Sequence, residues 1–319
     1  MKLYPMKLTA PCKDYIWGGN RLREEYGKTS DADRIAESWE LSCHKDGESI
    51  IFNGDFAGKT LSEFIKENGK DVLGKNCDKF DNFPILIKLI DAKENLSVQV
   101  HPDNEYALSV EGEYGKTEMW YIVDCDPGAE LLYGFKSNIG KEEFERRIKD
   151  NTLLEVTNSV PVHKGDVFFI EAGTLHAIGK GILIAEIQQN SNTTYRIYDY
   201  GRVGADGKPR QLHVEKAVEV TKLTPPEYPT KAMGEIEQKD GCSVQLLSKC
   251  DYFRVNKVCV WEHCVFEASA KSFNSLLVLD GEGEIDGVKL KKGDSCFIPA
   301  GYGEYTFKGK AEMVITDID

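Results

Sequence analysis

The sequence lacks the long apolar segments that a membrane protein or a secreted precursor would carry. Charged residues or glycines interrupt every apolar run well short of the roughly 18 residues that a membrane-spanning helix needs. The first residues, Met1 to Pro5, include no apolar stretch of the kind that forms a signal peptide. We therefore expect a cytoplasmic protein that has no membrane partner.

Positive charge is also scarce. The chain has 40 lysines and arginines against 53 aspartates and glutamates, which gives a formal net charge of -13. A nucleic-acid-binding protein needs a basic surface to attract phosphates, so this balance argues against a nucleic-acid partner. It does not argue against a small anionic substrate, because a few cations placed locally are enough to bind a phosphate.

Cysteines are present, but without the spacing of a disulfide framework. There are nine, an odd number, and no two are spaced as Cys-x-x-Cys. The last five, from Cys242 to Cys296, lie among apolar residues typical of strands. We expect reduced, buried cysteines, as in an ordinary cytoplasmic protein.

Helical signals are few and short. The segment Thr60–Glu63 has the pattern of a capping box and predicts the start of a helix. Ser137 or Asn138 could cap a second helix, and the apolar face 214–218 predicts a third that ends before Pro225. These helices are too sparse to alternate with the strands, which argues against a doubly wound parallel sheet.

Short apolar or alternating segments bounded by turn residues make up most of the remainder. Many such strands separated by glycine-rich turns indicate an all-β dominated sandwich or barrel. Three prolines within 222–229 mark the best candidate for a linker, so we expect a domain over 1–230 and another over 231–319. The expected strands cover 83–90, 96–100, 119–123, 167–170, 182–187, 243–247, 253–261, 275–279 and 313–315.

Each of the two expected domains contains one copy of a short sequence repeat. The segment 165–176 aligns without gaps on 293–304, with agreement at Gly, Asp, Phe, Ile, Ala and Gly. Both copies read as a turn, a short apolar strand, a second turn and a polar side chain. This agreement favours an internal duplication over a chance match between two glycine-rich β segments.

Both copies resemble the second motif of the cupin superfamily, G-x5-P-x-G-x2-H, whose histidine is a metal ligand. The first copy has His176 at that position and Glu171 in place of the proline, whereas the second has Pro299 and Glu304 in place of the histidine. The resemblance implies two cupin (jelly-roll) β-barrels with a few short helices. It also implies that the C-terminal copy is degenerate and has no metal site.

The other cupin ligands come from an H-x-H pair followed by a glutamate, and here Gln99, His101 and Glu118 occupy those places. Residues two apart on a strand point to the same face, so Gln99 and His101 can converge on one point. With His176, the set offers two imidazoles, one carboxylate and one amide oxygen. Zinc accepts such ligands and, with a single carboxylate, keeps a positive charge for catalysis.

Longer blocks resemble the signature sequences of the type I phosphomannose isomerases, in particular their short bacterial members. The similarity runs along most of the chain and is far more specific than the cupin motif alone. The blocks are Tyr15–Gly19, Ala36–Trp39, Phe83–Lys88, Leu96–Asp103, Lys116–Met119 and Glu186–Arg196.

This second resemblance implies one zinc ion per chain, bound by Gln99, His101, Glu118 and His176. It implies Arg196 as the catalytic arginine, and Ser97, Lys116, Lys88 and Glu186 as substrate-binding residues, with Ser97 at the phosphate. Two positions depart from the family pattern. Many members have aspartate where this chain has Asn192, and Asn104 replaces a lysine found in other branches.

The implied reaction interconverts mannose 6-phosphate and fructose 6-phosphate by moving a proton between C1 and C2 through an enediol-like intermediate. The base is left open between Glu186 and a zinc-bound water. The expected partner is a small phosphosugar, and the expected assembly is a monomer or a weak homo-oligomer.

Two other classes of function fit parts of the pattern. An iron-dependent cupin oxygenase would use two histidines and one carboxylate, a set that this site nearly supplies. Gln99 and the basic residues suit an anion better than oxygen chemistry. A non-catalytic sugar-phosphate-binding cupin should have lost a ligand or the arginine, and neither is missing. A buried histidine alone would more often be an ordinary core residue.

Overall fold

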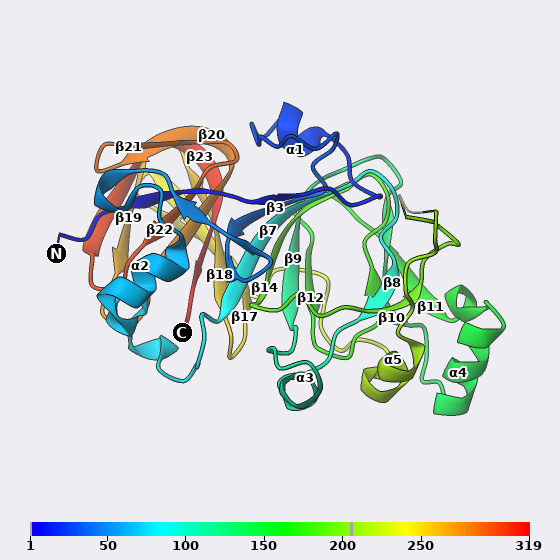
Figure 1. Ribbon diagram of the computed structural model, residues 1–319. Coiled ribbons are helices and arrows are strands. Elements are labelled where there is room, and N and C mark those ends of the chain that lie inside the picture. The colour runs from blue at the N-terminus through cyan, green and yellow to red at the C-terminus, as the bar shows by residue number, and fades with distance from the viewer. Residues whose placement is uncertain (1, 205–206) are drawn as a thin grey trace.

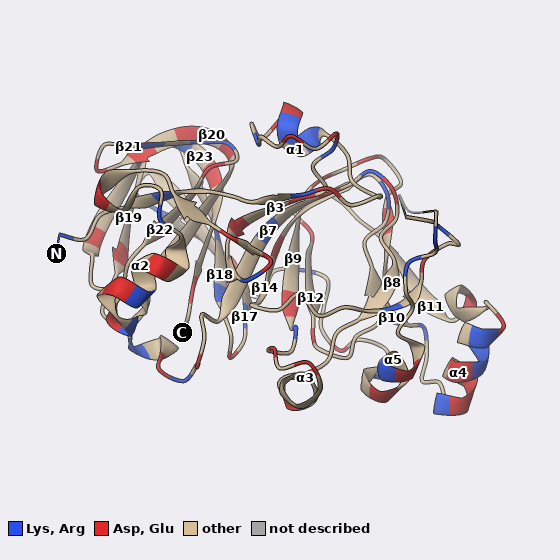
Figure 2. Ribbon diagram, viewed as in Figure 1, with Lys and Arg blue, Asp and Glu red and all other residues tan. Residues whose placement is uncertain are grey.

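The computed structural model describes residues 2–204 and 207–319, and among them strand residues far outnumber helical ones, as the sequence predicts. Figure 1 shows two lobes side by side, one of which is formed mainly by the C-terminal strands. Lysine and arginine segments alternate with aspartate and glutamate segments in both lobes (Figure 2). Among the described residues, no helix is long and apolar enough to cross a membrane.

Two sheets build the lobe that contains the predicted site, and an apolar core fills the space between them. Tyr133 on one sheet and Phe168 on the other place their ring centroids 5.6 Å apart within that core. The five-stranded sheet has the order β11 (Thr157–Pro161), β10 (Glu130–Phe135), β13 (His176–Ala177), β8 (Val98–Val100) and β15 (Tyr195–Tyr198). The six-stranded sheet has the order β12 (Val167–Ile170), β9 (Glu118–Cys125), β14 (Ile182–Gln189), β7 (Ile85–Ala92), β3 (Glu37–Leu41) and β2 (Cys12–Lys13).

A ten-stranded sheet dominates the other lobe. Its main path runs β16 (Ile236–Lys239), β17 (Cys242–Lys249), β18 (Arg254–Val260), β23 (Gly303–Asp317), β20 (Asn274–Ile285), β22 (Ser295–Ile298), β1 (Met6–Thr9) and β6 (Ile50–Ile51). Two further strands pair with this path, β19 (His263–Ala268) with β23 and β21 (Val288–Lys291) with β20. A separate pair consists of β4 (Cys43–His44) and β5 (Gly47–Glu48).

The helices are short and lie outside the sheets (Figure 1). Thr60 and Glu63 form the predicted capping box, in which each side chain bonds the other residue's backbone N–H. The second predicted helix begins one turn later than expected, with Gly140 as its N-cap instead of Ser137 or Asn138. The helices are α1 (Arg21–Glu24), α2 (Leu61–Asn68), α3 (Asn104–Val110), α4 (Lys141–Lys149) and α5 (Val214–Val220), and 3-10 turns cover Gly54–Phe56, Lys70–Leu73, Lys75–Cys77 and Leu153–Glu155.

The first strand joins the two lobes. β1 pairs with β22 in a register that places Met6 opposite Phe297, although the two residues are far apart in the sequence. Beneath this pairing, Phe297 packs against Phe273 and Phe64, with ring centroids 5.1 and 6.4 Å away. The N-terminal segment therefore contributes to the sheet and to the core of the C-terminal lobe.

The two copies of the sequence repeat adopt the same backbone geometry. Gly165 and Gly293 have φ angles of 96° and 87°, a left-handed conformation that favours glycine. The carbonyl of Asp166 accepts the N–H of Ile122, and the carbonyl of Asp294 accepts the N–H of Val278 in the same way. These shared turns support the duplication that the sequence indicates.

The second copy lacks the polar residues of the first at the corresponding positions. In the first copy Ile170 pairs with Glu118, whereas in the second the matching Ile298 pairs with Asn274. The Asn274 amide donates to the Tyr305 hydroxyl at 2.8 Å, and Glu304 is exposed. The interior of the C-terminal lobe there holds an amide and a phenol where the first copy holds a carboxylate and an imidazole.

The cysteine expectation is wrong at one place. Cys242 and Cys264 form a disulfide whose Cα atoms are 5.6 Å apart, and the other seven cysteines are free. Spacing along the chain could not reveal this pair, because strand pairing brings β17 and β19 into the same barrel core.

Replacing Phe297 by alanine should destabilise the fold by about 3–5 kcal/mol, since it removes a fully buried ring and leaves a cavity between the lobes. Urea unfolding followed by fluorescence measures this loss. The matched control is Phe52→Ala, because Phe52 is 65% exposed, and it should change stability by about 0.5 kcal/mol or less. Equal effects of the two substitutions would contradict the packing described here.

Candidate metal centre and substrate cavity

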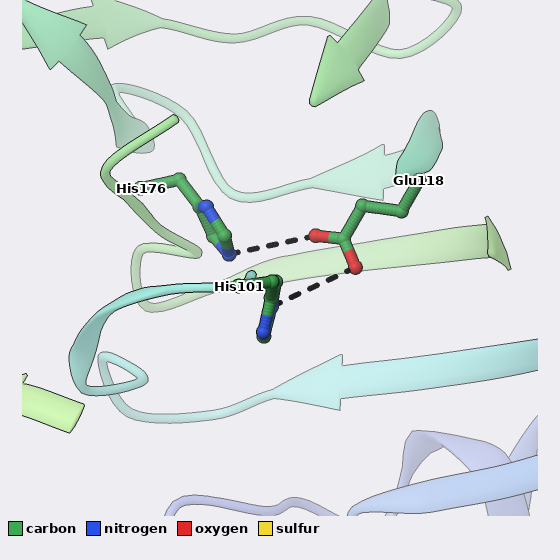
Figure 3. A group of neighbouring side chains, drawn as sticks. All are labelled: His101, Glu118 and His176. Carbon is green, nitrogen blue, oxygen red and sulfur yellow. Dashed lines mark ion pairs between the residues drawn. The ribbon is translucent and has the colours of Figure 1, made fainter. Parts of the chain in front are cut away.

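Three predicted ligands from three strands meet between the two sheets. His101 directly follows β8, Glu118 begins β9 and His176 begins β13. Their ligand atoms all lie within 4.8 Å of one another, and all three side chains are buried. Figure 3 shows both imidazoles facing the carboxylate, with His176 Nε2 3.5 Å from Oε1 and His101 Nε2 3.8 Å from Oε2.

Backbone carbonyls orient both imidazole rings. His101 Nδ1 lies 2.8 Å from the carbonyl of Thr193, and His176 Nδ1 lies 2.8 Å from that of Thr174. A carbonyl can only accept a hydrogen bond, so each Nδ1 carries a proton. In the neutral ring, Nε2 then presents a lone pair toward Glu118, which is the form that binds a metal.

Burial keeps these imidazoles neutral. It lowers the pKa of His176 to about 4, and burial together with the nearby Lys116 cation lowers the pKa of His101 well below its usual value. Neither ring therefore needs to lose a proton before binding a metal at neutral pH.

Lys116 places a cation inside the cluster. Its Nζ lies 3.1 Å from His101 Nε2 and 2.5 Å from Glu118 Oε2. Neither Glu118 oxygen has a hydrogen bond of acceptable geometry, although both are buried. Burial, followed by the charge of Glu186, raises the pKa of Glu118. A donor set that already attracts an ammonium group and leaves a buried carboxylate unsatisfied fits a divalent metal ion.

Gln99 completes the predicted ligand set. It pairs with His176 across β8 and β13, and its side-chain amide lies 3.4 Å from His176 Nε2. The other end of the same amide lies 3.4 Å from the hydroxyl of Ser97. Because a hydroxyl can donate or accept, Ser97 can hold the amide with either its oxygen or its nitrogen toward the cluster.

A row of buried charges extends from the cluster along the six-stranded sheet. Glu186 Oε1 lies 3.4 Å from Lys88 and 3.8 Å from Lys116, and Glu37 lies 3.5 Å from Lys88. Although burial opposes ionisation, the two lysines hold the pKa of Glu186 below its usual value, so this carboxylate stays charged. The Trp120 indole donates to Glu186 Oε2 at 3.0 Å, whereas Oε1 has no hydrogen bond.

A cavity of about 250 Å³ opens above the cluster. The predicted residues Gln99, Lys116, Lys88 and Glu186 contribute to its wall. The cavity therefore lies next to the candidate metal-binding group of His101, Glu118 and His176, which we call the metal cluster. Ser97 and Arg196 also line the cavity, together with Tyr15, Trp17, Glu37, Ile90, Leu96, Ile178, Asn192, Thr194 and Arg210.

Arg196 reaches the cavity from β15, directly opposite Gln99 in the strand pairing. Its Nη1 donates to the carbonyl of Gln211 at 2.9 Å, and its buried Nε has no hydrogen-bond partner. The side chain is therefore held at one end and offers an unused donor at the other.

The two positions that depart from the family pattern have different environments. Asn192 lines the cavity and donates to Asp46 at 2.8 Å, so it is held by the turn between β4 and β5. Asn104 does not line the cavity. Its Oδ1 accepts from the N–H of Gly115 at 2.8 Å and from Gln189 at 2.9 Å, which fixes the segment that precedes Lys116.

Comparison with known proteins identifies the family. The family model "Phosphomannose isomerase type I, catalytic domain" matches residues 6–124, and "Mannose-6-phosphate isomerase, cupin domain" matches residues 243–318. Mannose-6-phosphate isomerase ManA of Bacillus subtilis is 40% identical, with 100% of both chains covered. This chain belongs to the type I phosphomannose isomerase family. The predicted cupin fold is thereby confirmed.

A second sequence relative and a solved structure are also similar to this chain over nearly its whole length. The mannose-6-phosphate isomerase of Streptococcus mutans is 37% identical, with 97% of each chain covered. A crystal structure of the B. subtilis mannose 6-phosphate isomerase superposes with a TM-score of 0.90 at 36% identity, covering 98% of this chain and 99% of that one.

Sequence reasoning assigned no role to several residues of the cavity wall. Glu37 and Trp17 lie in blocks that resemble this family, but the resemblance gave neither of them a role. Arg210 and Thr194 carry no motif of their own. Arg210 follows the polar segment 199–209, and only the folded chain brings it back to the cavity.

The cluster predicts that metal binding stabilises the fold. After chelator treatment, adding a divalent transition metal should raise the thermal midpoint, because a ligand at 100 times its Kd contributes about 2.7 kcal/mol. Calorimetry measures the shift, which His176→Ala should abolish. His163→Ala is the matched control, since the His163 side chain is 81% exposed, and it should retain the full shift. A metal-induced shift that persists in His176→Ala would contradict the assigned cluster.

Proposed function

We propose that the protein is a mannose-6-phosphate isomerase that binds one zinc ion and interconverts D-mannose 6-phosphate and D-fructose 6-phosphate. The observation that carries the proposal is the burial of His101, Glu118 and His176 together beneath a cavity with basic side chains in its wall. Membership of the family supports it, because relatives that match nearly the whole chain are named for this activity.

The donor set supports zinc as the metal. Two neutral imidazoles, one carboxylate and the amide of Gln99 are nitrogen and oxygen ligands of the kind that zinc accepts. The carbonyls of Thr193 and Thr174 fix the imidazole tautomers, which is how proteins commonly support zinc-binding histidines. A bound zinc ion would supply positive charge to the substrate oxygens at C1 and C2.

Residues of this chain would supply the rest of the chemistry. Isomerisation moves a proton between C1 and C2, so it needs a base beside the carbons and positive charge beside the oxygens. Glu186 is the best candidate for the base, because it stays ionised and its Oε1 has no hydrogen bond. Lys116 and Arg196 would stabilise the developing oxyanion, and arginine is too strong a base to give up its own proton.

Two further side chains in the wall of the cavity would support the base and contact the substrate. Lys88 lies between Glu37 and Glu186 and would keep Glu186 charged before the proton is transferred. Ser97, which is buried beside Gln99, would contact the substrate. The two lysines and two arginines of the wall favour a phosphosugar over the non-polar and oxygen substrates of an oxygenase.

We also propose the domain division and the setting of the protein. Residues 1–230 would form the catalytic domain, and residues 231–319 a second cupin domain without a metal site, joined to the first through β1. A cytoplasmic location is supported by the seven free cysteines. The net charge of -13 argues against a nucleic-acid partner, and the proposed partner is a small phosphosugar, bound by a monomer or weak homo-oligomer.

The proposed activity is tested by coupling fructose 6-phosphate formation from mannose 6-phosphate to a dehydrogenase assay. Activity should disappear after chelator treatment and return when zinc is restored. Folded, zinc-loaded protein that shows no turnover would refute the mannose assignment.

Arg196→Ala should lower kcat by a factor on the order of 100 to 1,000 and leave zinc bound, because the arginine acts on the transition state and not on the metal. Steady-state kinetics and metal analysis of the same preparation measure both quantities. Arg146→Ala, on the exposed face of α4, is the control and should match the wild type. Loss of zinc from Arg196→Ala would instead assign the arginine a structural role.

A further inference from the structure

A group of arginines surrounds one carboxylate at the edge of the cavity. Asp199, whose side chain is only 6% exposed, accepts two hydrogen bonds from Arg210, at 2.7 Å from Nε and 2.5 Å from Nη2. Arg202 donates a hydrogen bond to the same carboxylate. The guanidinium of Arg210 is thus held in a fixed plane, and it belongs to the cavity wall.

Backbone contacts place Arg210 beside Arg196. Arg196 Nη1 donates to the carbonyl of Gln211, the residue that follows Arg210, at 2.9 Å. The carbonyl of Arg196 in turn accepts the N–H of His213 at 2.7 Å. The segment that carries Arg210 is therefore attached directly to β15, and both guanidiniums face the same cavity.

Within the described part of the chain, the guanidiniums at this edge outnumber the carboxylates that pair with them. Arg202 and Arg210 share the single carboxylate of Asp199, and Arg196 has no ion pair within residues 2–204 and 207–319. On the cavity floor, by contrast, Lys88 and Lys116 face three carboxylates. Burial, and after it the charge of Arg210, lowers the pKa of Arg196, which reflects this crowding of like charges. An anion bound here would relieve the repulsion and would satisfy the unpartnered Nε of Arg196.

We propose that Arg210, held by Asp199, anchors the phosphate group of the substrate at the edge of the cavity, next to Arg196. This inference rests on the proposed function and names the residue that would bind the substrate's charged end. A planar guanidinium fixed by a carboxylate is suited to phosphate because its remaining donors need no reordering. The phosphate at this edge would direct C1 and C2 toward the metal cluster.

The anchor role predicts a change in KM and little change in kcat. Arg210→Ala should raise the KM for mannose 6-phosphate on the order of 10- to 100-fold, the effect expected for losing a charge-assisted hydrogen bond. The kcat should change by less than about 3-fold, because the contact is made equally in the ground and transition states. Arg210→Lys, which keeps the charge but loses the planar fork, should fall between the two.

Two further probes separate phosphate binding from turnover and from folding. Turnover of unphosphorylated D-mannose, followed at high substrate concentration, should be the same in Arg210→Ala and wild type. Calorimetric titration of inorganic phosphate into the zinc-loaded protein should show binding that Arg210→Ala weakens by a similar factor. This titration needs no catalysis, so its result stands even if the protein does not isomerise mannose 6-phosphate.

Arg202→Ala is the matched control. Arg202 shares Asp199 with Arg210 and lies on the same segment, but it does not line the cavity and donates to the carbonyl of Asn95 instead. Its substitution should change the KM by about 2-fold or less. Equal effects of Arg202→Ala and Arg210→Ala, an equal loss of D-mannose turnover, or no phosphate binding by the wild type would each overturn the proposal.

Discussion

The structure depends on keeping charged groups buried between two sheets without leaving them uncompensated. An isolated buried carboxylate is costly, and here Glu118, Glu186 and Glu37 are all buried. Lys88 and Lys116 lie between them, so each carboxylate has a cation within 4 Å. Removing Lys88 would leave Glu37 without its cation, and removing Lys116 would do the same to Glu118, so the members of the row are coupled in energetic terms.

The two facing sheets are what makes this arrangement possible. The six-stranded sheet supplies Glu118, Glu186 and Lys88, while His101 and His176 come from the five-stranded sheet. Neither sheet alone could surround the cluster, because side chains on one face of a sheet point in the same direction. The cupin architecture thus provides a buried interior that lowers the pKa values of His101 and His176, so that both imidazoles stay neutral.

Sequence patterns predicted most of the fold and the floor of the site. The sequence predicted His101, Glu118 and His176 as ligands because they occupy the ligand positions of the family motifs that the chain resembles, and the structure brings the three side chains together. The start of α4 was wrong by a few residues because Ser137 and Asn138 have the composition of a cap but Gly140 has the required position. Arg210 could not be predicted, since a polar segment without periodicity returns it to the cavity. The Cys242–Cys264 bond likewise depends on how strands pair and not on spacing.

The pairing of β1 with β22 has a consequence for the order in which the chain is made. Met6 leaves the ribosome long before its partner Phe297, because the two residues are far apart in the sequence. During most of synthesis β1 can pair with β6, but the edge that will pair with β22 has no partner. The metal-cluster lobe is complete in sequence well before that moment. The nascent chain thus passes through a stage at which its future site could form while β1 still lacks its partner strand β22.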